Sequence, residues 1–198
     1  MNGKILIVTA HLKEAKLLAA SLSGCVSGPL PYRYSAPGMV ILVAGQGEES
    51  LRRSLVSLPL TGIRVLLLFG TAGSLTTVYA PGMVLECPWV HTLEGDILVS
   101  PLSLGLPRAS ILAVPGPVID PAEREELFRE HGTLLVDMES GGFVKIVKER
   151  GLPWAVVKVV SDTPSEPDTF PFSVELDTLL RENARVFLGG GREVFCDH

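Results

Sequence analysis

The sequence predicts an α/β fold of three layers, α/β/α, in which a mixed but mostly parallel central sheet lies between helices. Short apolar runs rich in β-branched residues alternate with segments of helical periodicity, as in sheets covered on both faces. The stretch 83–114 contains three expected strands and no helix, so the sheet is expected to be mixed there. A length of 198 residues fits one domain. We expect that domain over 1–188, followed by a C-terminal tail over 189–198.

Strands are expected where apolar runs are bounded by glycine, proline or charged residues. In chain order they are Lys4–Thr9, Met39–Ala44, Val65–Phe69, Met83–Val90, Ile97–Ser100, Ala109–Val114, Leu134–Asp137 and Ala155–Ser161. Two glycine-rich segments, 45–47 and 70–73, directly follow the second and third of these runs, and we expect each to form a turn.

Helices are expected between these runs, where apolar residues recur at helical spacing or charged residues dominate. In chain order they are Leu12–Leu22, Glu48–Leu58, Pro121–His131, Met138–Arg150 and Phe172–Leu188. The first carries Leu17, Leu18 and Leu22 on one stripe, and the third opens with proline in its first turn. The fourth stops at Gly151, a residue typical of helix C-termini.

Charge and hydropathy argue against two classes of partner. A net charge of −5 and a pI near 5.4 disfavour nucleic acid, because a polyanion requires a basic face. The first apolar run is too short for a signal peptide. The uncharged stretch 65–85 is interrupted by glycine and proline, so two buried strands fit it better than a membrane span. We therefore expect neither a nucleic-acid nor a membrane partner.

The cysteines and histidines indicate no metal site. Cys25, Cys87 and Cys196 are far apart, and neither they nor the four histidines have the spacing of metal ligands. Reduced thiols are typical of the cytoplasm, where we expect the protein to be located. The chain has only three side-chain amides, a scarcity typical of a thermophilic source.

Three carboxylates are expected to gather at one edge of the sheet, since ligands of α/β sheets bind beyond the carboxyl ends of the strands. Glu14, Glu139 and Asp162 each come shortly after an expected strand, as do the glycine segments 45–47 and 70–73. Each acid alone has a structural explanation. A glutamate in the first turn complements the helix dipole, and the aspartate can stabilise a turn. Their convergence favours a site.

At these residues the chain resembles the nucleoside phosphorylase/nucleosidase superfamily, of the purine and uridine phosphorylase type. The matching segments, in order, are ILIVTAHLKEAKLL, GTAGSL, VDMES and VVKVVSDTPSE, at 5–18, 70–75, 136–140 and 156–166. They are most similar to the branch that contains 5′-methylthioadenosine/S-adenosylhomocysteine nucleosidases. The stretch 121–140 resembles phosphorylase-like proteins associated with hopanoid synthesis. The resemblance implies a phosphorylase/hydrolase-like fold, a small-molecule nucleoside substrate and a homo-oligomer, with a dimer favoured.

The resemblance also implies roles for individual residues. Glu14 would activate the attacking water, and Asp162 would protonate the leaving purine at N7. Glu139 would bind the ribose hydroxyls. The remaining implied substrate-binding residues are Met138, Thr71, Ala72, Gly73, Ser161, Phe172 and Ile119. No cofactor is implied, although inorganic phosphate would be the co-substrate of a phosphorylase.

Three functions stay open. Hydrolysis of a purine-type, adenosine-derived nucleoside is favoured by Glu14 and by the lack of the Gly-x-Pro-x-Arg phosphate loop of many phosphorylases. Phosphorolysis is left open by Lys13 and Lys158 near the expected site. A non-catalytic nucleoside-binding homologue is suggested by the segment 81–118, which is shorter than is usual in the family. Lys158 also stands where the family usually has arginine, and Val118 where a phenylalanine commonly stacks on the base.

Overall fold

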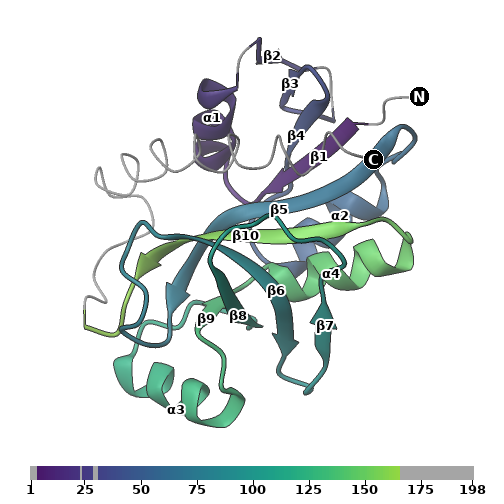
Figure 1. The fold of residues 1–198 in the computed structure, drawn as a ribbon. Coiled ribbons are helices and arrows are strands. Elements are labelled where there is room, and N and C mark those ends of the chain that lie inside the picture. Colours follow the sequence, from purple (N-terminus) through teal and green to yellow (C-terminus); the bar gives the residue numbers. More distant parts are fainter. Residues whose placement is uncertain (1–3, 23, 29–30, 166–198) are drawn as a thin grey trace.

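A computed structural model describes residues 4–22, 24–28 and 31–165. Within this part of the chain, ten strands form one sheet and four helices accompany it (Figure 1). The strands are β1 (Lys4–Thr9), β2 (Val26–Ser27), β3 (Tyr34–Ala36), β4 (Met39–Val43), β5 (Ile63–Ser74), β6 (Val84–Thr92), β7 (Ile97–Val99), β8 (Arg108–Ala113), β9 (Leu135–Asp137) and β10 (Trp154–Asp162). The helices are α1 (Leu12–Ser21), α2 (Glu48–Val56), α3 (Pro121–His131) and α4 (Ser140–Glu149).

Part of the sheet closes on itself. The strand order is β10-β6-β8-β9-β5-β1-β4-β3-β2, and β10 also pairs with β5, so that β5, β10, β6, β8 and β9 form a ring. Five of the described strand pairings are parallel and five are antiparallel. The predicted α/β fold with a mixed sheet is therefore confirmed. Its three-layer, mostly parallel form is not reproduced in detail, because ring closure and the short strands β2, β3, β7 and β9 add antiparallel pairs.

Helices pack on both sides of β1, whose side chains alternate between the two faces of the sheet. Leu6 and Val8 belong to the core cluster that includes residues of α2 and α4, whereas Ile5 and Ile7 belong to the cluster that includes residues of α1. Residues 5–8 of β1 are therefore all apolar, because both faces of the strand are covered. After the end of this strand come His11, the N-cap of α1, and Glu14, in the first turn of that helix.

The predicted turn at 70–73 is wrong. These residues continue β5, because Gly70 pairs with Lys158 and Gly73 pairs with Asp162 along β10. Asp162 is accordingly the last residue of β10 rather than the residue after it. The turn at 45–47 is confirmed, with positive φ angles of 91° at Gly45 and 81° at Gly47.

The other elements agree with the predictions to within a few residues. The strands β2 and β3 were not predicted, since two or three residues are too short to show a period. Helix α4 begins at Ser140 rather than Met138, and the side chain of Asp137 accepts a hydrogen bond from the Ser140 N–H. The predicted helix 172–188 and the tail 189–198 lie outside the described residues.

Candidate active site

A cavity of about 310 Å³ opens where β1, β5, β9 and β10 end, a volume within the usual range for small-molecule sites. Every predicted site residue that the structure describes lines it. These residues are Glu14, Thr71, Ala72, Gly73, Ile119, Met138, Glu139, Ser161 and Asp162. Phe172 lies outside the described residues. His11, Arg124, Asp137 and Lys158 also line it. Lys158 had been expected near the site, whereas Arg124 and Asp137 had not been predicted as parts of it.

Glu14 lies in the first turn of α1, with 1% of its surface exposed. Its Oε2 accepts a hydrogen bond of 2.9 Å from the backbone N–H of His11, in the arrangement of a capping box. Burial raises the pKa of Glu14 to about 7, although the His11 N–H and the charge of Lys158 act in the opposite direction. A carboxyl with this pKa can take up a proton near neutral pH, as a general base must.

Glu139 lies between β9 and α4 and reaches the turn that follows β4. Its Oε1 accepts a hydrogen bond of 3.0 Å from the backbone N–H of Gly47, and its Oε2 is 4.0 Å from Nζ of Lys158. Burial raises the pKa of Glu139, and the charge of Lys158 opposes that rise. The positive φ at Gly47 thus has a local function, since it turns a backbone N–H toward this carboxylate.

Lys158 and Asp137 form a buried ion pair beside these two glutamates. Nζ of Lys158 is 2.7 Å from Oδ2 of Asp137, and only 1% of the lysine is exposed. Asp137 also accepts hydrogen bonds from the backbone N–H and the hydroxyl of Ser140, at 3.1 and 2.5 Å. Burial by itself would lower the pKa of Lys158, but Asp137 and Glu139 raise it, so the side chain stays charged. A lysine within the apolar run AVVKVVS was the sequence signal for this buried cation.

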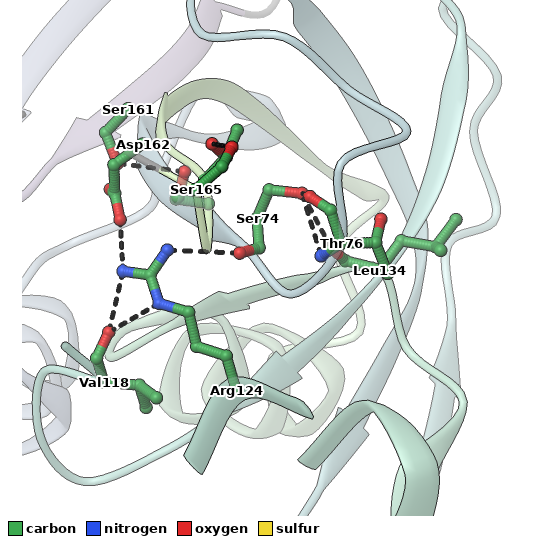
Figure 2. A network of polar contacts seen from close by, with 10 residues as sticks. Ser74, Thr76, Val118, Arg124, Leu134, Ser161, Asp162 and Ser165 are labelled. Carbon is green, nitrogen blue, oxygen red and sulfur yellow. Dashed lines mark hydrogen bonds and ion pairs between the residues drawn. The ribbon is translucent and has the colours of Figure 1, made fainter. Parts of the chain in front are cut away.

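Asp162 lies at the other end of the cavity and is held on both of its carboxylate oxygens (Figure 2). Oδ1 accepts a hydrogen bond from the hydroxyl of Ser161, and Oδ2 forms an ion pair with the guanidinium of Arg124. Sequence reasoning missed Arg124, because one arginine among the charges of α3 resembles an exposed residue. Its burial depends on contacts with residues far away in the sequence.

Five more of the predicted site residues line the cavity. Thr71, Ala72 and Gly73 come from the end of β5, where the strand lies beside β10. A Cβ atom at Gly73 would be 3.4 Å from Oδ2 of Asp162, so a small residue there keeps space beside this carboxylate. Met138 precedes Glu139, and Ile119, with 57% of its surface exposed, lies at the mouth.

The site holds more carboxylates than cations, but their arrangement does not resemble a metal centre. Among the described residues there is no group of three or more histidine, cysteine, aspartate or glutamate side chains that could hold a metal ion. Lys158 and Arg124 each neutralise a carboxylate instead. No helix within the described part of the chain is long and apolar enough to cross a membrane.

Comparison with known proteins shows which proteins this chain resembles. The family model of the phosphorylase superfamily matches residues 103–188. This match confirms the resemblance inferred from the sequence motifs. The matched segment runs from the region before β8 through β10 and includes Asp137, Glu139 and Asp162. No curated protein sequence matches the chain significantly.

Solved structures with the same fold cover nearly the whole chain. Futalosine hydrolase of Helicobacter pylori matches with a TM-score of 0.79 and 18% identity, over 98% of both chains. The 5′-methylthioadenosine/S-adenosyl homocysteine nucleosidase of Campylobacter jejuni matches with a TM-score of 0.79 and 16% identity, over 98% of this chain and 99% of that chain. The corresponding nucleosidase of Neisseria meningitidis, in complex with methylthio-immucillin-A, matches with a TM-score of 0.79 and 14% identity, over 96% and 99%. The protein therefore has the fold of these nucleosidases and this hydrolase.

Proposed function

We propose that the protein is a nucleosidase that hydrolyses the N-glycosidic bond of a purine nucleoside derived from adenosine. The observation that carries the proposal is that Glu14, Glu139 and Asp162, which come from separate parts of the chain, line one cavity. The solved structures that share the fold are named for such reactions. The nucleosides in those names, 5′-methylthioadenosine, S-adenosylhomocysteine and futalosine, are the first candidates for a substrate.

In this proposal, water attacks C1′ of the ribose while the bond from C1′ to N9 of the purine breaks. The bonding electrons move into the base, which gains a proton at N7. Glu14 takes a proton from the water, as its raised pKa allows. Glu139 accepts hydrogen bonds from the ribose hydroxyls and offsets the positive charge that develops on the sugar. Asp162 shares a proton with N7 and releases it to the departing base.

Charge favours water over phosphate as the attacking group. Among the described residues, one lysine and one arginine line the cavity, and each of them, Lys158 and Arg124, is paired with a carboxylate. A phosphate entering the Glu14 end would also meet the carboxylates of Asp137 and Glu139, and like charges repel at such short range. Phosphorolysis is therefore the second candidate. It would require Lys158 to leave Asp137 for the phosphate.

Product analysis tests these alternatives. The purified protein is incubated with 5′-methylthioadenosine, S-adenosylhomocysteine and futalosine, with and without inorganic phosphate. Free ribose or its 5′-substituted form supports hydrolysis, whereas the ribose 1-phosphate supports phosphorolysis. Replacement of Asp162 by asparagine should lower kcat by about 10²- to 10⁴-fold, the usual contribution of a general acid. Asp96→Asn, at an exposed turn, is the matched control and should leave kcat unchanged.

A third outcome would contradict the proposal that the protein is an enzyme. If purine nucleosides bind without turnover and Asp162→Asn changes nothing, the chain is a non-catalytic nucleoside-binding homologue. Isothermal titration with adenine and with 5′-methylthioadenosine distinguishes this case from a protein that binds neither. The shortened segment 81–118 is the feature that would favour it.

We also propose that residues 1–188 form a single domain and that the protein is a homo-oligomer, most simply a dimer. Apolar side chains that are exposed on the β6–β7 hairpin support association: Trp89, Leu93, Ile97 and Val99. Light scattering coupled to size-exclusion chromatography measures the mass in solution, and a monomer would contradict the proposal. The cytoplasmic location and the thermophilic source stay predictions.

A further inference from the structure

Arg124 is a buried charge on an otherwise exposed helix. Arg124 is the buried residue of α3, with 3% of its surface exposed. An arginine is almost never fully buried unless its charge is paired. The cost of removing a guanidinium from water must therefore be offset by the specific contacts that it makes.

These contacts join three segments at the Asp162 end of the cavity (Figure 2). The guanidinium donates to the backbone carbonyl of Val118 through Nε and one terminal nitrogen, at 3.0 and 2.8 Å. The other terminal nitrogen donates to the carbonyl of Ser74 at 3.2 Å. The ion pair with Asp162 completes the set. Arg124 thus connects the loop before α3, the end of β5 and the end of β10.

Two hydrogen bonds define the orientation of the Asp162 carboxylate. Arg124 holds Oδ2, and the Ser161 hydroxyl holds Oδ1 and also lies 3.1 Å from the carbonyl of Ala72. The hydroxyl has one hydrogen for these two acceptors. When Asp162 is ionised, Ser161 can donate to it. When Asp162 carries a proton on Oδ1, that proton can point to the Ser161 oxygen while Ser161 donates to Ala72.

Ser161 can therefore accompany both charge states of Asp162, while the guanidinium of Arg124 stays beside Oδ2. In the proposed reaction, Asp162 becomes ionised when its O–H bond breaks and the N7–H bond of the base forms. A fixed positive charge beside Oδ2 stabilises that carboxylate without any rearrangement. The effect is strong here because the pair is shielded from water.

We propose that Arg124 is a positioning residue for this reaction. It aims Asp162 at the base and stabilises the carboxylate that remains once the proton has passed to the leaving purine. The inference rests on the proposed function, since it concerns the acid of that reaction. Four hydrogen bonds to protein groups hold the guanidinium in place, so it acts through Asp162 rather than on the substrate.

The test compares two leaving groups. A purine needs a proton to depart, whereas the phenolate of 4-nitrophenyl β-D-riboside leaves without one. Arg124→Met should lower kcat for the nucleoside by about 10²-fold or more, within the range for general acid catalysis. Its effect on kcat for the aryl riboside should stay within about threefold. Equal losses on both substrates would show that Arg124 only supports the fold, and no loss on either would also overturn the inference.

Further variants keep the test decisive. Arg124→Lys retains a positive charge and should have part of the nucleoside activity that Arg124→Met loses. This variant can also be measured if Arg124→Met does not fold. In an Asp162→Asn background, Arg124→Met should cause almost no further loss of nucleoside activity, and an additive loss would overturn the inference. Arg129→Met is the control, since Arg129 lies exposed on the same helix. If the unaltered protein cleaves no nucleoside, the proposed function itself is wrong. A failure that concerns Arg124 alone would instead leave the nucleoside activity of the unaltered protein intact.

Discussion

The buried carboxyl of Glu14 makes the stability of the protein depend on pH in a way that can be calculated. Its pKa is raised from the ordinary 4.5 to about 7, mainly by burial. A folded state that binds the proton more tightly than the unfolded state loses stability as pH rises between the two values. The resulting loss in the free energy of unfolding is absent below about pH 4.5, grows as the pH rises to about 7 and is constant above that value. At about 1.36 kcal/mol for each pH unit, the full cost is about 3 kcal/mol.

Glu14→Gln removes this cost, because glutamine has no charge to bury. Relative to the unaltered protein, the variant should become more stable as pH rises, by about 2–3 kcal/mol between pH 5 and pH 8. Urea unfolding at both values measures the difference. The matched control is Glu123→Gln, an exposed glutamate in the first turn of α3, which should change stability by only a few tenths of a kcal/mol. A difference that is independent of pH, or a variant that loses stability at pH 8, would refute the reasoning.

Other predictions follow from single contacts. Glu14→Gln should also abolish most turnover, and kcat/KM of the unaltered protein should fall below about pH 7, where Glu14 takes up its proton. Lys158→Met leaves Asp137 buried without its partner and should cost about 3–5 kcal/mol in urea unfolding, and a loss below 1 kcal/mol would contradict the pairing. Gly70→Ala places a Cβ 3.1 Å from Oε1 of Glu14, so kcat should fall roughly tenfold while the circular dichroism spectrum is retained. Asp120→Ala removes the side-chain cap of α3 and should cost about 1 kcal/mol in thermal unfolding, with kcat unchanged.

Local patterns predicted most of the elements that position the site. The nearly continuous apolar runs of β1 and β10, the proline at the start of α3 and the glycine turn after β4 all depend on residues close together in the chain. The length of β5 could not be found in this way. Glycine-rich residues 70–73 look like a turn in isolation, and they become strand because β10 supplies partners for them.

By itself, the sequence determined where most of the described strands and helices lie and that Glu14, Glu139 and Asp162 lie at or shortly after strand ends. Periodicity and strand termini are local properties, so the sequence carries them directly. Only the tertiary structure decided that five strands close into a ring, that Lys158 pairs with Asp137 and that Arg124 pairs with Asp162. Those pairings join residues far apart in the chain, 38 positions in the last case. A charge becomes buried and selects its partner only when the packed chain excludes water from both.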